Sequence, residues 1–223
     1  PANAQTATLV SVLEGDVIEV DINGVRETVR YLGVDTPDAG QPGFATAAAA
    51  NRLLLQGGSP LLLLAEQTDR DSANRLLRHV YVENKTVSPF FNGGYAGIYI
   101  NGQMVADGWA LPQTIAPDLS QAPNLSLWGL DAAKNGRGFW TAANAPNDAA
   151  TFALTSGATV LYSGPGADTP ADSAASPETP LYVLGRSPDG GWVQVRAPRE
   201  DAGWVFVPQV SLSGPVSALA VTG

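Results

Sequence analysis

The sequence has 223 residues, of which 44% are hydrophobic and 15% charged, a composition typical of a globular chain of one or two domains. Its 21 acidic and 12 basic residues give a formal charge of −9, which disfavours general coating of nucleic acid through a basic surface. The absence of cysteine excludes disulfides and thiolate chemistry, and the single histidine, His79, excludes multi-histidine metal sites. No apolar run approaches the roughly 18 residues that cross a bilayer, so we expect no membrane span.

The first 40 residues have the pattern of a β-meander. Apolar and polar residues alternate in three predicted strands, at residues 8–12, 17–22 and 28–34. Asn23-Gly24 predicts a tight hairpin turn between the second and third strands, because both central positions of that turn need positive φ.

The following hundred residues mix helices and strands. An alanine-rich stretch, residues 44–55, predicts a helix. Further predicted strands lie at residues 60–66, 76–82 and 98–100, with Asn101-Gly102 as a second hairpin turn, and further predicted helices at residues 104–111 and 124–134. This order predicts a mainly β fold, a small barrel padded by helices.

The last third of the chain has a different pattern. A small, polar, proline-containing stretch at residues 140–148 predicts a linker. Short strands are predicted at residues 159–162, 181–184, 192–196 and 203–206, with a long ordered loop at residues 163–180. About 60 residues with four or five strands predict a second small barrel.

Acidic residues gather at the ends of the first strands. Asp16 lies in a turn, and Asp35 follows the third strand, five residues after Arg30. If the strands close into a barrel, Asp16 and Asp35 could meet at one rim, where two carboxylates with a carbonyl and waters suit Ca²⁺. A guanidinium beside them suits a phosphate. On spacing alone, the alternative that these are solvated turn acids stays open.

Five segments carry a family resemblance. VLEGDVI at residues 12–18 and RYLGVDTPD at residues 30–38 resemble the staphylococcal nuclease family, and DSANRLLRHVYV at residues 71–82 resembles its second signature. The resemblance continues through NGQMV at residues 101–105 to AAKNGRGFW at residues 132–140. It implies a five-stranded barrel of the OB-fold type over residues 1–142.

The resemblance implies a role for each site residue. Asp16, Asp35 and the Thr36 carbonyl would bind Ca²⁺. Arg30 and Arg75 would bind the phosphodiester of a DNA or RNA substrate and stabilise the negative charge that builds up in the transition state. Asp38 would orient or deprotonate the attacking water. These roles imply a calcium-dependent phosphodiesterase.

Three positions depart from the family pattern. Glu14 stands where the family usually has aspartate, Val17 where it has threonine, and Asp38 where it has the longer glutamate. These departures keep a second hypothesis open, namely a non-catalytic nuclease-like module that binds or scaffolds at the cell surface.

The second barrel resembles bacterial Src-homology-3-like domains. The resemblance rests on VLYSGPG at residues 160–166, VLGR at residues 183–186, GWVQV at residues 191–195 and AGWV at residues 202–205. It implies a linker at residues 143–152, a barrel at residues 153–215 that binds cell-wall peptide or polysaccharide, and a tail at residues 216–223. Together with the small-x-small pattern of Ala2-Asn3-Ala4, it predicts a secreted or envelope-bound bacterial protein, in which wall binding by the second barrel alone is a third hypothesis.

Overall fold

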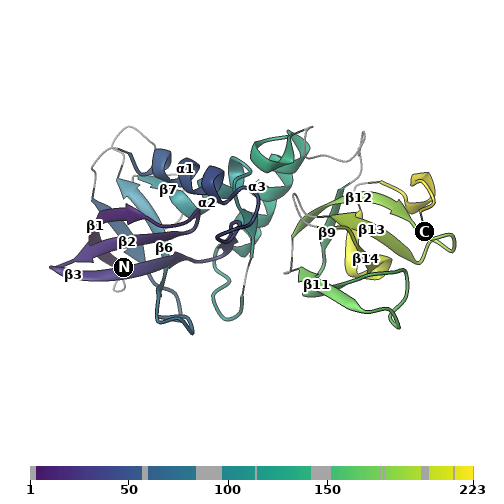
Figure 1. Cartoon of the computed structure of the whole chain (residues 1–223), viewed down its shortest axis with the longest axis horizontal. Coiled ribbons are helices and arrows are strands. Elements are labelled where there is room, and N and C mark those ends of the chain that lie inside the picture. The colour runs from purple at the N-terminus through teal and green to yellow at the C-terminus, as the bar shows by residue number, and fades with distance from the viewer. Residues whose placement is uncertain are drawn as a thin grey trace. The chain divides into compact units, whose positions relative to one another are not determined.

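A computed structural model gives the structure of the chain (Figure 1). It describes residues 4–56, 60–83, 97–113, 115–141, 152–175, 177, 179–196, 201–212 and 214–222. Almost all of the predicted linker, and Ala2 and Asn3 of the small-x-small pattern, lie outside the described residues. The chain divides into two compact units, residues 1–125 and 126–223.

The first unit contains a closed five-stranded barrel. Its strands are β1 (Ala4–Val12), β2 (Val17–Ile22), β3 (Val25–Tyr31), β5 (Leu61–Leu64) and β6 (Leu76–Glu83). They follow the order β3-β2-β1-β5-β6, and a parallel pairing of β3 with β6 closes the ring. A short strand, β7 (Gly97–Tyr99), extends the sheet beyond β6. The mainly β, OB-type barrel predicted from the sequence is confirmed.

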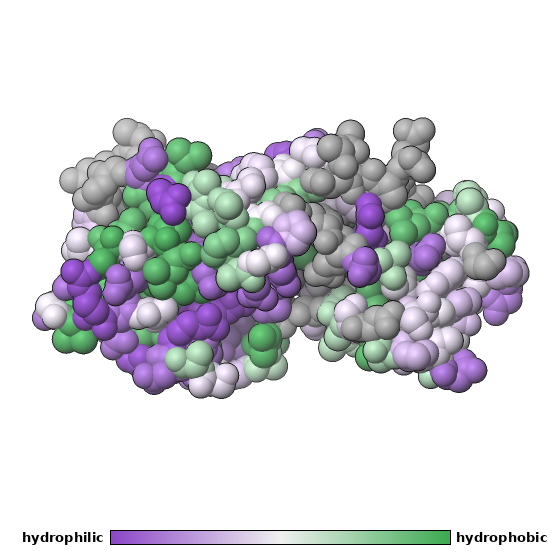
Figure 2. Space-filling view, in the orientation of Figure 1, coloured by the Kyte–Doolittle hydropathy of each residue, from purple (hydrophilic) through white to green (hydrophobic). Residues whose placement is uncertain are grey.

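Alternation along each strand places the core inside the barrel. Val29 and Tyr31 on β3 are buried, whereas Arg30 between them points to the other face. Leu61 and Leu63 on β5 repeat the pattern. The outer face of β3 is therefore free to carry charge, and Figure 2 shows hydrophilic residues over β2 and β3 on the visible side of this unit.

Helices α1 (Phe44–Leu54) and α2 (Ile100–Ala106) pack against the barrel strands. A third helix, α3 (Ala122–Lys134), begins at the end of this unit and is followed by a short 3-10 helix, η1 (Gly138–Trp140). Helix α1 buries Ala47 and Ala48, whose small side chains allow close packing. A two-stranded ribbon of β4 (Val34–Asp35) and β8 (Leu111–Pro112) lies beside the barrel. Among the described residues, no helix is both long and apolar enough to cross a membrane.

Two sequence predictions in this unit were wrong. The third strand ends at Tyr31 and not at residue 34, because Gly33 adopts φ +77° and turns the chain before β4. The predicted turn Asn101-Gly102 lies inside α2, which replaces the helix predicted at residues 104–111. Asn101 is buried there, accepts a hydrogen bond from the Val80 amide and donates to the Leu32 carbonyl, so it joins the helix to the barrel.

The second unit contains one antiparallel sheet of seven strands in its described part. They are β9 (Phe152–Thr155), β10 (Thr159–Tyr162), β11 (Ala171–Ala175), β12 (Pro180–Arg186), β13 (Trp192–Arg196), β14 (Gly203–Phe206) and β15 (Val210–Leu212), in the order β11-β10-β14-β13-β12-β9-β15. Short 3-10 helices, η2 (Val207–Gln209) and η3 (Val216–Ala218), follow β14 and β15. Its core includes Val193, Val195 and Val205, each with no exposed surface.

The sequence predicted four or five strands in this unit, fewer than the seven in its described part. The predicted loop at residues 163–180 contains β11, which pairs with β10. That strand reads ADSAA, without the branched and aromatic residues that signal a strand, so its pairing comes from its neighbour and not from its own propensity.

Candidate functional site

Arg30 lies at the centre of a charged cluster on the outer face of the first barrel. The antiparallel register of β2 and β3 pairs Val17 with Arg30, so the preceding residue, Asp16, lies beside it. The Tyr31 amide donates to the Asp16 carbonyl at 2.8 Å and fixes this register. Nη1 of Arg30 donates to Oδ2 of Asp16 at 2.6 Å.

The second carboxylate reaches Arg30 through the turn at Gly33. This turn returns the chain to β4, where Asp35 accepts a hydrogen bond from Nη2 of Arg30 at 3.0 Å. One guanidinium therefore bridges the carboxylates of Asp16 and Asp35. Asp16 is buried, with 2% of its side chain exposed, whereas 41% of Asp35 is exposed.

Burial raises the pKa of both aspartates. For Asp16, loss of solvation outweighs the attraction of Arg30, and the pKa rises to about 6. For Asp35, burial also outweighs Arg30, and the charges of Asp38 and Glu14 raise the pKa further. Glu14 thus lies close enough to raise the pKa of both aspartates, Asp38 raises that of Asp35, and Arg30 is the cation that Asp16 and Asp35 share.

Thr36 is buried beside this cluster. Its Oγ1 hydroxyl faces Asp16 closely enough to act, as a hydrogen-bond donor, to lower the pKa of that carboxyl. A Cβ atom built on Gly15 would lie 2.7 Å from both this oxygen and Cβ of Ala47, so only glycine allows the turn before Asp16 to pack so closely against α1.

The donor set is one of hard oxygen atoms. Two carboxylates bonded to one guanidinium and the buried hydroxyl of Thr36 match Ca²⁺ in chemical type. Within the described residues, no group of three or more His, Cys, Asp or Glu forms a metal site by itself. A cation here would therefore need main-chain or water ligands in addition to Asp16 and Asp35.

Asp38 lies at the exposed edge of the cluster. Its main-chain amide donates to Oε1 of Gln41 at 2.8 Å. Its carboxylate has no hydrogen-bond or ion-pair partner among the residues described, and it acts on Asp35 through space. The structure therefore leaves the Asp38 carboxylate open to solvent next to Asp35.

Arg75 directly precedes β6 and is not part of the ion pairs of Arg30. The parallel pairing of β3 with β6 sets Arg30 opposite Leu77, two residues after Arg75. The Nε atom of Arg75 donates to Oδ2 of Asp71 at 2.7 Å. Each of the two predicted arginines is thus held by carboxylates of the chain itself.

Sequence reasoning missed Gln113. Its Oε1 accepts a hydrogen bond from Nη2 of Arg30 at 3.3 Å, and its main-chain amide donates to the Gly33 carbonyl at 2.9 Å. Gln113 follows β8 and lies 83 residues from Arg30 along the chain. No local motif marks it, because only the pairing of β4 with β8 brings it to the site.

His79 is packed away from this cluster, as expected for a histidine in a central strand. Its Nδ1 lies 2.7 Å from the Tyr99 hydroxyl, and its Nε2 lies 2.5 Å from Oε1 of Glu66. The Ser120 hydroxyl donates to the same carboxylate. Because both ring nitrogens are occupied, His79 serves to join β6, β7 and the segment after β5.

Comparison with known proteins identifies the first unit. A family model described as staphylococcal nuclease homologue matches residues 28–142, a span that contains Arg30, Asp35, Asp38, Arg75 and Gln113. Endonuclease YncB of Bacillus subtilis (strain 168) is 32% identical over 142 residues, which cover 59% of this chain and 65% of that protein.

Two further relatives match shorter segments. The SPbeta prophage-derived endonuclease YokF of the same organism is 37% identical over 86 residues, which cover 36% of this chain and 29% of that protein. A thermonuclease of Staphylococcus hyicus is 44% identical over 41 residues, covering 18% and 24%. The matched segments thus span less than two thirds of each relative.

Proposed function

The chain belongs to the family of staphylococcal nuclease homologues, and we propose that it is a calcium-dependent nuclease that hydrolyses the phosphodiester bonds of DNA or RNA. The observation that carries the proposal is the bridge that Arg30 makes between Asp16 and Asp35. A purely structural ion pair needs one carboxylate, whereas this arrangement places excess negative charge beside a cation, at a surface position.

The arginines supply the phosphate-binding groups. Hydrolysis of a phosphodiester builds negative charge on its non-bridging oxygens, and guanidinium groups stabilise that charge through paired hydrogen bonds. Arg30 lies on β3 and Arg75 directly precedes β6, the strand that pairs with β3, and one extended phosphodiester would contact both arginines. Asp38, with an open carboxylate near Asp35, would orient or deprotonate the attacking water.

Asp16, Asp35 and the Thr36 carbonyl would hold the cation. A bound Ca²⁺ supplies further stabilisation of the negative charge on the phosphate. With the cation present, the two carboxylates have a second positive partner, so Arg30 is no longer needed to neutralise both of them.

The proposal is tested by assaying cleavage of single-stranded DNA and RNA with and without Ca²⁺. We expect metal-dependent cleavage that Arg30→Ala and Asp35→Ala abolish, while circular dichroism shows that the fold is kept. Absence of cleavage by the pure protein with any divalent cation would reject it.

The non-catalytic module is the second candidate. The observation in its favour is that both arginines are already engaged by carboxylates of the chain, Arg30 by Asp16 and Asp35, and Arg75 by Asp71. It predicts binding of nucleic acid or of a surface protein without cleavage, so the same assay, combined with a binding titration, separates the two candidates.

We further propose that residues 153–215 form a Src-homology-3-like, envelope-binding barrel after a linker at residues 143–152 and before a tail at residues 216–223. A row of aromatic rings on adjacent strands supports binding by this unit, because Trp192 contacts Tyr162 and Phe206 with ring centroids 5.5 Å apart. Phe206 is 42% exposed, as a contact residue for peptide or polysaccharide needs to be.

Sedimentation of the full chain with purified bacterial cell wall tests this second role. We expect retention of the wild type and loss of retention in Trp192→Ala. Equal recovery of both proteins in the supernatant would reject it. Secretion or envelope attachment is a separate proposal, tested by locating the protein in fractionated cells.

A further inference from the structure

A rigid polar turn precedes β6 and ends at Arg75. The Asp71 amide donates to the Arg75 carbonyl, and the Asn74 amide donates to the Asp71 carbonyl, both at 3.0 Å. Asn74 adopts φ +65°, a conformation that asparagine tolerates better than most residues. The turn therefore fixes the main chain on which Arg75 is carried.

The two oxygens of the Asp71 carboxylate have different partners. Oδ1 accepts the main-chain amides of Ala73 and Arg75, at 3.0 and 2.9 Å. Oδ2 accepts Nε of the Arg75 side chain at 2.7 Å. Burial acts to raise the pKa of Asp71, but these hydrogen bonds from Arg75 and Ala73 hold it below its ordinary value, so the carboxylate stays ionised at neutral pH.

The hydrogen bond from Nε of Arg75 to Asp71 leaves the two terminal nitrogens of the guanidinium available. Neither terminal nitrogen of Arg75 has a hydrogen-bond partner among the residues described, and 30% of the side chain is exposed. Two terminal nitrogens of one guanidinium are the donors that bind two oxygens of one phosphate.

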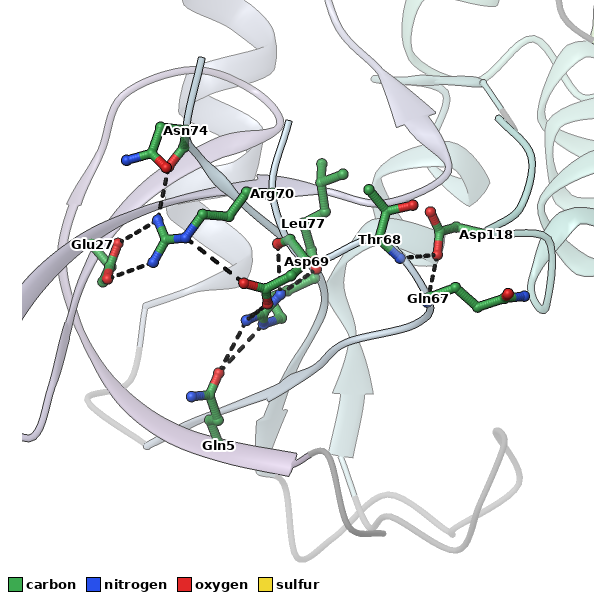
Figure 3. A network of polar contacts seen from close by, with 10 residues as sticks. Gln5, Glu27, Gln67, Thr68, Asp69, Arg70, Asn74, Leu77 and Asp118 are labelled. Carbon is green, nitrogen blue, oxygen red and sulfur yellow. Dashed lines mark hydrogen bonds and ion pairs between the residues drawn. The ribbon is translucent and has the colours of Figure 1, made fainter. Parts of the chain in front are cut away.

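The turn is also tied to the strand that carries Arg30. Figure 3 shows Arg70 making two contacts with Glu27 of β3, at 3.0 and 2.8 Å, and a third with the Asn74 carbonyl at 2.8 Å. Asp69, the residue before Arg70, accepts a hydrogen bond from Nη2 of Arg78 on β6 at 2.7 Å. The position of Arg75 relative to β3 therefore depends on a connected set of ion pairs.

We propose that Asp71 is a positioning residue that holds Arg75 by its Nε atom and presents both terminal nitrogens to the phosphate of the substrate. This inference rests on the proposed nuclease function. It assigns no catalytic step to Asp71, which acts only through Arg75. A residue that merely stabilised the turn would not need to contact the arginine side chain.

Asp71→Asn separates positioning from turn stability. Its Oδ1 keeps the two main-chain hydrogen bonds, whereas the amide nitrogen that replaces Oδ2 cannot accept from Nε of Arg75. We expect kcat/KM to fall by about tenfold to a hundredfold, mainly through kcat, with little change in Tm. Asp21→Asn is the matched control, because Asp21 also accepts a main-chain amide, from Gly24, and pairs with an arginine, Arg26, outside the site.

A double-mutant cycle with Arg75→Ala makes the test specific. If Asp71 acts through Arg75, Asp71→Asn has no further effect once Arg75 is replaced. Full activity in Asp71→Asn, or an equal loss with and without Arg75, would overturn the inference. A wild type that cleaves nothing would instead overturn the proposed function.

A spectroscopic experiment tests the contact between Asp71 and Nε of Arg75 without an activity measurement. In ¹⁵N-labelled protein, the Nε–H signal of Arg75 should exchange slowly with solvent, and Asp71→Asn should make it exchange as fast as that of the exposed Arg52. Fast exchange of this signal in the wild type would contradict the contact, whether or not the protein is an active nuclease.

Discussion

Nη1 of Arg30 lies 2.6 Å from Oδ2 of Asp16, which joins a carboxylate with almost no exposed side-chain surface to its cation. A buried pair of this kind contributes little net stability, but removal of one partner leaves the other charge buried and uncompensated. The chemistry of the site and the stability of the barrel are therefore linked through the same contact.

The first prediction concerns Arg30→Met, which keeps the apolar part of the side chain and removes its charge. We expect a loss of at least about 100-fold in nuclease activity, since the variant lacks a group that binds the transition state. Stability should fall by about 3 kcal/mol at pH 8 and by less at pH 5, where Asp16 takes up a proton. Urea denaturation at the two pH values checks this, and equal losses at both would contradict it.

The second prediction concerns the pH dependence that Asp16 confers. Its pKa is about 6 in the folded chain and 3.8 ordinarily, so the folded state binds more protons than the unfolded state between about pH 4 and pH 6. The free energy of unfolding therefore decreases as the pH rises through this window. Asp16→Asn, which resembles the protonated side chain, should be more stable than the wild type above pH 6, on the order of 2 kcal/mol, and similar to it near pH 4.

Chemical denaturation in the presence of a chelator measures this difference, because bound cations would otherwise add their own stabilisation. Asp21→Asn, which alters an aspartate of the first hairpin away from Arg30, serves as the control. A wild type whose stability rises between pH 4 and pH 6, relative to Asp16→Asn, would show that the sign is wrong.

The third prediction concerns Ca²⁺. If Asp16 and Asp35 hold the cation, saturating Ca²⁺ should raise Tm at pH 8 by roughly 5 °C, because a ligand bound only by the folded state stabilises it. Asp35→Asn should abolish the increase, while Asp21→Asn should keep it. A thermal melt at constant ionic strength distinguishes specific binding from screening, and an unchanged Tm in the wild type would argue against the site.

The fourth prediction concerns Gly15. An alanine here would place its Cβ 2.7 Å from atoms of Ala47 and Thr36, so the turn before Asp16 must move. We expect Gly15→Ala to destabilise the chain by about 1–3 kcal/mol and to lower activity. Gly157→Ala is the control, since a Cβ at Gly157 meets nothing within 4 Å. Similar melting of the two variants would contradict the packing argument.

The sequence predicted the parts of the site that depend on local order. Asp16, Arg30 and Asp35 lie within 20 residues, around a short hairpin, so alternation and turn signals indicated that they could meet, and the family resemblance favoured this over solvated turn acids. The five-stranded barrel followed from the same signals together with the family resemblance.

Other parts depend on contacts that local patterns do not contain. Asn101-Gly102 has the composition of a turn, but the buried hydrogen bonds of Asn101 to the Val80 amide and the Leu32 carbonyl place it within a helix. Gln113 reaches Arg30 only because β8 pairs with β4. In such cases tertiary contacts outweigh local propensity.

The parallel pairing of β3 with β6 also has a consequence for how the proposed activity would arise during folding. Arg30 lies on β3 and Arg75 directly precedes β6, and the paired residues Val29 and Leu76 are far apart along the chain. In a folding intermediate that lacks the pairing of β3 with β6, the two guanidiniums would not be held near each other. They could then not bind one phosphate together. Nuclease activity would then report the completion of the barrel, and a partly folded chain would be harmless to nucleic acid.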